Sequence, residues 1–264
     1  MSFGATGVIG TSFKVARSNF FKVLGLYFLG GIVAVLVTGI FSAVGLSQAT
    51  GGANGVASFS ASLIIGQVLA NIPMLAAGLA TIGLLAHDAT GRRISFGGAA
   101  KLGLRKTPIS IVVSLLLSLI VTLAVLPLLG MVAAMGPESP AVVLMALAMI
   151  PFFMWLNAVL IPVFPALVVE DLGISAIKRG FSLSSGYRLG IIWAQILMGL
   201  VLFGMLLAFG LVSGMLTAGV MNGSSAIDGM MILTMLVYLL MFSFMMTVVV
   251  SFQAAVYARL VECE

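Results

Sequence analysis

Few residues in this sequence are able to carry out chemistry, because it contains seven carboxylates, one histidine and one cysteine. His87 and Asp88 are adjacent, which is typical of a proton relay, of half a metal site, or of a polar cap at a helix end. A metal site needs three or four ligands, and the chain has no second histidine, while Cys263 lies far along the sequence. We favour the polar cap, and the sequence predicts neither a metal site nor a cofactor.

A second acidic pair, Glu170 and Asp171, precedes a basic segment. Negative charge is favourable near the N-terminus of a helix, so we interpret this pair mainly as structural charge with cations close by. The sequence contains no P-loop, no H-E-x-x-H and no C-x-x-C, and a serine nucleophile has no base partner beyond His87. We therefore expect no catalytic residues and a protein that is not an enzyme.

Amide side chains interrupt several apolar stretches. Gln67 and Asn71 are spaced i and i+4, Asn157 lies midway along a later stretch, and Gln195 and Gln253 follow in two others. Buried amides usually bond neighbouring helices, and the alternative is a polar pathway or a pocket for a lipid headgroup. Proton- and ion-coupled pumps use ionisable groups inside the membrane. This sequence places none there, which argues against such a pump.

The elements that position these residues follow from composition. Hydrophobic residues make up 62% of the 264 residues, charged residues 7%, and the mean hydropathy is +1.29. Soluble domains carry about 25% charged residues, so a soluble globular domain, a disordered chain and a disulfide scaffold are excluded. A membrane-spanning helix needs about 20 apolar residues. Six stretches qualify and predict an all-α polytopic membrane protein: 23–46, 59–86, 108–135, 141–169, 189–220 and 230–257.

Positive charge is confined to one side of this predicted topology. The loops near 47–58, 136–140 and 221–229 contain no lysine or arginine, whereas the alternate segments contain all twelve. Basic loops stay in the cytoplasm. We therefore expect a multi-pass protein of the inner (plasma) membrane with both termini in the cytoplasm. The twelve basic residues are Lys14, Arg17, Lys22, Arg92, Arg93, Lys101, Arg105, Lys106, Lys178, Arg179, Arg188 and Arg259.

Three basic segments, at the start of the chain, near 96–105 and near 174–182, have the pattern of amphipathic helices that lie along a membrane surface. Their cations would meet anionic headgroups. The order of surface helix, span, outer loop and span predicts one membrane domain, 1–264, with three repeats: 8–91, 92–171 and 172–264. The alternative is a plain six-helix bundle with basic linkers. The candidate lipid- or partner-binding cations are Lys14, Arg17, Lys101, Arg105, Lys178 and Arg179.

Three prolines fall within fifteen residues of the fourth span: Pro151, Pro162 and Pro165. An interior proline removes a backbone donor and kinks or breaks a helix. The fourth span is therefore the best candidate for a broken helix. Such a break serves either as a hinge or opened backbone site, or only as a packing kink.

Small residues recur every four positions along the fifth span, at Gly210, Gly214 and Ala218. A ladder of small residues allows two helix backbones to approach closely in a membrane. The close contact is either within the bundle or with a partner, so Gly210 and Gly214 are candidate partner-binding residues.

Two segments resemble a known family. Residues 163–170 (VFPALVVE) and 176–183 (AIKRGFSL) are similar to the proline-containing fourth span, exit acid and A-x-[KR]-[RS]-x-F-x-L helix of the glycerophosphoryl diester phosphodiesterase membrane-domain family and its YciC-like relatives. The end of the chain also resembles that family's last span, with Tyr257 and Arg259. The resemblance implies a six-span membrane part without the hydrolase, which is a separate soluble barrel in the fused proteins.

We expect a non-enzymatic membrane accessory or scaffold protein. It would bind anionic lipid headgroups, or a membrane-protein partner or second copy, and it would not bind nucleic acid. The alternative is a transporter or permease for a small molecule or lipid. Its site would be formed by the polar residues of the second and fourth spans: Gln67, Asn71 and Asn157.

Overall fold

The computed structural model of the protein describes residues 3–48, 53–136, 138–221 and 227–264, without the side chains of 45–60 and of most residues in 212–242. Every regular element in these ranges is a helix. Six segments of the described chain are long and apolar enough to cross a membrane, which confirms the predicted all-α polytopic architecture. The helices are α1 (Ala5–Gln48), α2 (Ala53–Ala89), α3 (Phe96–Met135), α4 (Pro140–Leu160), α5 (Val163–Val169), α6 (Ser175–Ser184), α7 (Arg188–Met221) and α8 (Ile227–Cys263).

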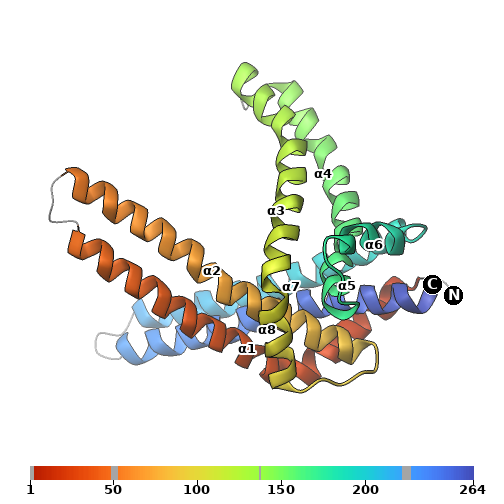
Figure 1. The fold of residues 1–264 in the computed structure, drawn as a ribbon, viewed down its shortest axis with the longest axis horizontal. Coiled ribbons are helices and arrows are strands. Elements are labelled where there is room, and N and C mark those ends of the chain that lie inside the picture. The colour runs from red at the N-terminus through yellow and green to blue at the C-terminus, as the bar shows by residue number, and fades with distance from the viewer. Residues whose placement is uncertain (1–2, 49–52, 137, 222–226) are drawn as a thin grey trace.

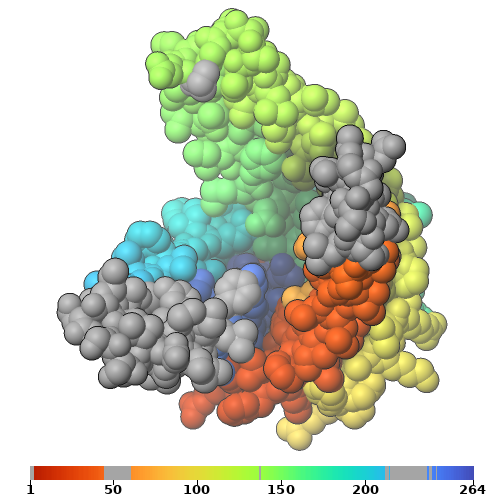
Figure 2. Space-filling model, turned by 90° about the vertical axis from the view of Figure 1, so that its left-hand side faces the viewer, coloured from red at the N-terminus to blue at the C-terminus, as the bar shows by residue number. Residues whose placement is uncertain are grey.

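The long helices form three hairpins, α1 with α2, α3 with α4, and α7 with α8, which diverge from a common base (Figures 1 and 2). Both chain termini lie at the base end (Figure 1). Away from the base the helices expose large aliphatic side chains, such as Leu115, Leu119 and Leu123 of α3. A water-soluble protein does not display apolar surface on this scale, so these arms belong in lipid.

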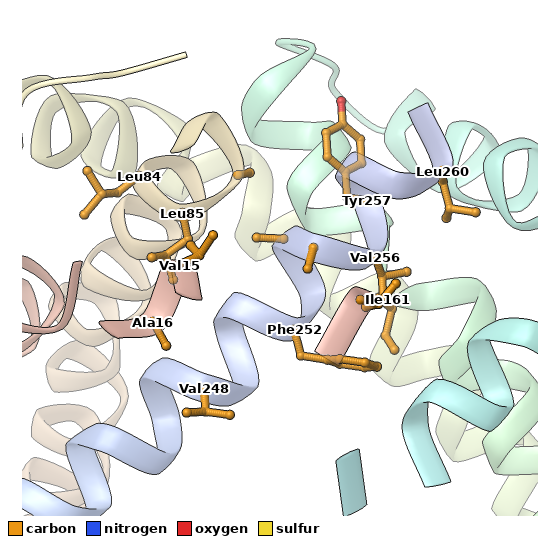
Figure 3. Close-up of a cluster of buried hydrophobic side chains, with 14 of the residues drawn as sticks. Val15, Ala16, Leu84, Leu85, Ile161, Val248, Phe252, Val256, Tyr257 and Leu260 are labelled. Carbon is orange, nitrogen blue, oxygen red and sulfur yellow. The ribbon is translucent and has the colours of Figure 1, made fainter. Parts of the chain in front are cut away.

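The hydrophobic core is concentrated at the base, which we call the junction. It is built from Ala99 and side chains within 8–26, 80–86, 158–166, 183–198 and 248–260. Val15 and Ala16 of α1, Leu85 of α2, and Val248 and Val256 of α8 are all buried there (Figure 3). The junction therefore joins the beginning, middle and end of the chain.

Two glycines allow helices to pack at backbone distance near the junction. A Cβ built on Gly103 of α3 would collide with the Ala76 carbonyl oxygen and lie 2.8 Å from the Ala80 nitrogen of α2. A Cβ on Gly180 of α6 would lie 2.5 Å from Cγ2 of Val163 in α5. Any side chain at these positions would push the helices apart.

The predicted surface helices require a correction. The first two basic segments are not separate elements, because α1 and α3 each continue through the basic segment into the apolar span without a break. No residue at those points ends the helix, and Pro108 lies inside α3. Only the third segment is separate: α6 ends at Ser184, and Gly186, with φ of 85°, turns the chain into α7.

The break predicted in the fourth span is confirmed. α4 ends at Leu160 and α5 begins at Val163 after a short turn. Pro162 and Pro165 have no N–H group, so the carbonyls of Ala158 and Ile161 lose their helical donors at this point. Although α5 is short, Val163, Ala166 and Leu167 are fully buried. Ala166 packs in the junction core, and Val163 and Leu167 pack in a second buried cluster with α2 and α3, so buried packing fixes the break.

Candidate functional site

A cluster of charged and polar side chains lies beside the junction core; we call it the acid–arginine cluster (Glu170, Arg179, Tyr257 and Glu264). The Arg179 Nε donates to Glu170 Oε2 at 2.9 Å, and its terminal nitrogens donate to both Glu264 oxygens at 2.7 Å. The hydroxyl of the buried Tyr257 donates to Glu170 Oε1 at 2.9 Å. These contacts tie the end of α5 to α6 and to the end of α8.

The pKa values of Glu264 and Arg179 in this cluster are shifted by their contact. Hydrogen bonds from the Arg179 guanidinium lower the pKa of the Glu264 carboxyl. The same hydrogen bonds, together with those to Glu170, raise the pKa of Arg179 above its already high value. Arg179 is therefore charged under all working conditions and is held by two carboxylates.

A second charged contact joins the turn after α5 to α3. The Lys106 ammonium contacts the Asp171 carboxylate, and the Lys106 side chain is only 7% exposed. Arg105, which is largely exposed, approaches the same carboxylate at 3.5 Å. The Lys106 hydrogen bond, and then the charges of Lys106 and Arg105, lower the pKa of Asp171. Sequence reasoning did not distinguish the buried Lys106 from its exposed neighbours.

A third contact joins the end of α2 to α1. The Asn19 amide donates to Asp88 Oδ2 at 2.8 Å, and the Ser18 hydroxyl lies 3.4 Å from the same oxygen. His87 Nδ1 lies 2.7 Å from the Gly83 carbonyl oxygen of its own helix. Asp88 thus contacts α1 and His87 contacts its own helix, and the polar cap stays a prediction.

These three contacts share one relation. In each predicted repeat, an acidic residue near the end contacts the segment that begins the same repeat: Asp88 with α1, Asp171 with α3, and Glu264 with α6. A threefold repeat is expected to produce such a recurrence, although the partners differ chemically. The repeat itself stays a prediction.

The six candidate lipid-binding cations differ in exposure and pairing. Lys14, Arg17, Lys101 and Lys178 are exposed, and none of them forms an ion pair with a described residue. Arg179 is 28% exposed and fully engaged by carboxylates, so its geometry is that of a structural residue. Arg105 is intermediate, since it is exposed but faces Asp171.

The intramembrane amides do not form a single site. Gln67 and Asn71 line a cavity of about 410 Å³ between α1 and α2, and the Asn71 side-chain amide donates to the Gln67 backbone carbonyl at 2.8 Å. Asn157 lines a separate cavity of about 180 Å³ with Gln195 of α7 and Gln253 of α8. The structure thus groups Asn157 with the amides of the fifth and sixth spans and not with those of the second.

The glycine ladder of α7 makes no close approach within the described part of the chain. A Cβ added at Gly204, Gly210 or Gly214 would meet no described atom within 4 Å. The side chain of Ala218 lies outside the described residues. Close helix contacts occur instead at glycines such as Gly103, whose spacing in the sequence is not distinctive.

Comparison with known proteins identifies no relative, because no family model, curated protein or solved structure matches this chain. Membership of the glycerophosphoryl diester phosphodiesterase membrane-domain family therefore stays a prediction. The residues that carry the resemblance nevertheless meet in space: Glu170, Arg179 and Tyr257 all belong to the acid–arginine cluster. Within the described ranges, no group of three or more histidine, cysteine, aspartate or glutamate residues is placed to hold a metal ion.

Proposed function

We propose that this protein is a non-enzymatic accessory or scaffold protein of the inner membrane that binds anionic lipid at its basic end. The observation that carries this proposal is the contrast between the two groups of cations. Arg179 and Lys106 are held by carboxylates and stabilise the junction, whereas Lys14, Arg17, Lys101 and Lys178 are exposed without a described counter-ion. Exposed cations at the ends of membrane helices are suited to anionic headgroups.

The orientation is part of the same proposal. The hairpin bases carry the basic residues and both termini, and the positive-inside rule favours the cytoplasm for such an end. Each lysine or arginine near an anionic surface contributes about 1 kcal/mol. Four exposed cations therefore supply about 4 kcal/mol of attraction, which salt screens over a Debye length of about 8 Å at physiological ionic strength.

The test is lipid enrichment around the reconstituted protein. Wild-type protein is reconstituted in nanodiscs of mixed phosphatidylglycerol and phosphatidylcholine and then extracted. We expect the lipids that remain bound to it to contain a larger fraction of phosphatidylglycerol than the bulk bilayer. The fourfold variant K14Q/R17Q/K101Q/K178Q should show a smaller enrichment, and 0.5 M salt should reduce that of the wild type, as screening requires. The control is R259Q/E262Q, which removes an ion pair without changing net charge. Unchanged enrichment in the fourfold variant contradicts the proposal.

A specific observation also favours the second candidate function, a permease. Three amides from α4, α7 and α8 line one cavity beside the break between α4 and α5, and the Gln195 Nε2 is buried without a described hydrogen-bond partner. Such an arrangement is suited to a small polar solute or to water.

Thiol labelling separates this function from the scaffold. In a C263S background, a cysteine replacing Asn157 should react with a water-soluble methanethiosulfonate reagent if a solute reaches the cavity. A cysteine replacing Leu115 on the exposed face of α3 provides the lipid-facing control. If the cysteine at position 157 reacts no faster than the cysteine at position 115, the permease function is contradicted and the scaffold function remains.

A further inference from the structure

An apolar groove of about 650 Å³ lies among α1, α2 and α3. Its walls are aliphatic, from Leu29 and Val33 of α1 to Leu104 and Ile111 of α3, and α2 packs against both of these helices. All three helices are candidate membrane spans, so the groove is placed at the depth of lipid acyl chains. Its volume is in the range of small-molecule binding sites.

A polar pocket of about 440 Å³ lies between α1, the end of α2 and the connection (93–95) that leads into α3. Lys22 and Arg93 line it, both are exposed, and neither forms an ion pair with a described residue. Its one carboxylate, Asp88, already accepts hydrogen bonds from Asn19 and Ser18. The pocket therefore contains two cations, Lys22 and Arg93, that have no described ion-pair partner.

The polar pocket and the apolar groove follow one another along the helices. Lys22 in the pocket and Leu26 in the groove are one turn apart on α1, as are Leu84 and Ala80 on α2. Four helical residues rise about 6 Å. The cationic pocket thus lies one helical turn from the apolar groove, toward the basic end of the helices. An anionic lipid has the matching arrangement, with its headgroup next to its acyl chain.

We propose that the groove and the pocket together bind one anionic glycerophospholipid. One acyl chain lies along the groove, and the phosphate lies between the Lys22 ammonium and the Arg93 guanidinium. Guanidinium groups recognise phosphate oxygens through paired hydrogen bonds. The inference rests on the proposed binding of anionic lipid and deepens it, because it assigns a single bound molecule to residues outside the four exposed cations named above.

Native mass spectrometry of the full chain in detergent, with added dioleoyl phosphatidylglycerol, tests this site. We expect one phosphatidylglycerol to remain on each wild-type chain after the others are stripped. R93Q should weaken its retention at least tenfold, and K22Q/R93Q further. R92Q is the matched control, because Arg92 is an exposed neighbouring arginine that does not line the pocket.

The groove is tested by filling it from an exposed position. Val33, 46% exposed, lines the groove, whereas Leu36, 60% exposed, lies on the same helix away from it. V33W should therefore expel the lipid, while L36W should retain it with the same thermal stability.

Three results would overturn the inference: equal losses in R92Q and R93Q, retention of the lipid in V33W, or displacement by millimolar inorganic phosphate alone. The first would indicate a general charge effect, which leaves the proposed function standing, because that is measured separately by enrichment in the fourfold variant. The last would indicate an anion pocket without a role for the groove.

Discussion

Replacing Arg179 with glutamine separates a structural role of this cation from a lipid-binding one. Its side chain is 28% exposed and that of Glu170 25% exposed, so the contact between them is only partly screened by solvent. Hydrogen bonds to charged groups contribute about 1.5–3 kcal/mol net. Glu264 is 51% exposed, and exposed ion pairs contribute at most about 1 kcal/mol. We therefore expect R179Q to lower the free energy of unfolding by about 2 kcal/mol, mostly through Glu170.

The neighbouring Lys178 provides the matched control. Lys178 carries the same charge as Arg179 and lies on the same helix, but it is exposed and has no described ion-pair partner. Substitutions at such surface positions change stability by about 0.5 kcal/mol or less. K178Q should therefore leave the unfolding free energy nearly unchanged while reducing phosphatidylglycerol enrichment.

Unfolding by sodium dodecyl sulfate in mixed micelles, followed by far-ultraviolet circular dichroism, measures these differences. A double-mutant cycle with E170Q isolates the contact between Glu170 and Arg179, for which we expect a coupling energy of about 1–2 kcal/mol. If R179Q and K178Q unfold within about 0.5 kcal/mol of each other, the assignment of Arg179 as a structural residue is refuted.

Two further predictions follow from the packing and charges of the junction. G103A should destabilise the protein by about 3 kcal/mol, because the new methyl group meets the α2 backbone at Ala76 and Ala80, whereas G97A, with open space around it, should not; the same unfolding assay compares them. Acidification should also destabilise the protein. The pKa values of Asp171 and Glu264 are lowered in the folded state, so their contribution is complete above about pH 4 and is lost as pH falls through the lowered values. D171N/E264Q should flatten the dependence of the thermal midpoint on pH between 6 and 3, and an unchanged slope would contradict the assignment.

Some features depend on local properties and could be predicted without the fold. Six spans follow from the length of apolar stretches, and the break at Pro162 follows from a missing backbone donor. The same local reasoning was wrong about the first two surface helices. Amphipathic periodicity shows that a segment is helical, but it does not show where the helix ends. Without a terminating residue such as Gly186, α1 and α3 continue into their spans.

The sequence by itself therefore determined the class of protein, the number of spans and the confinement of positive charge to alternate segments, because hydrophobic length and charge are read residue by residue. Only the tertiary structure decided which cations are paired. Lys178 and Arg179 are adjacent, yet only Arg179 meets Glu264, 85 residues away. It also grouped Asn157 with Gln195 and not with Asn71, and it brought Lys22 and Arg93 to one pocket. The physical reason is that contacts between distant residues depend on how helices pack, and close packing depends on a few glycines and buried aliphatic side chains at the junction.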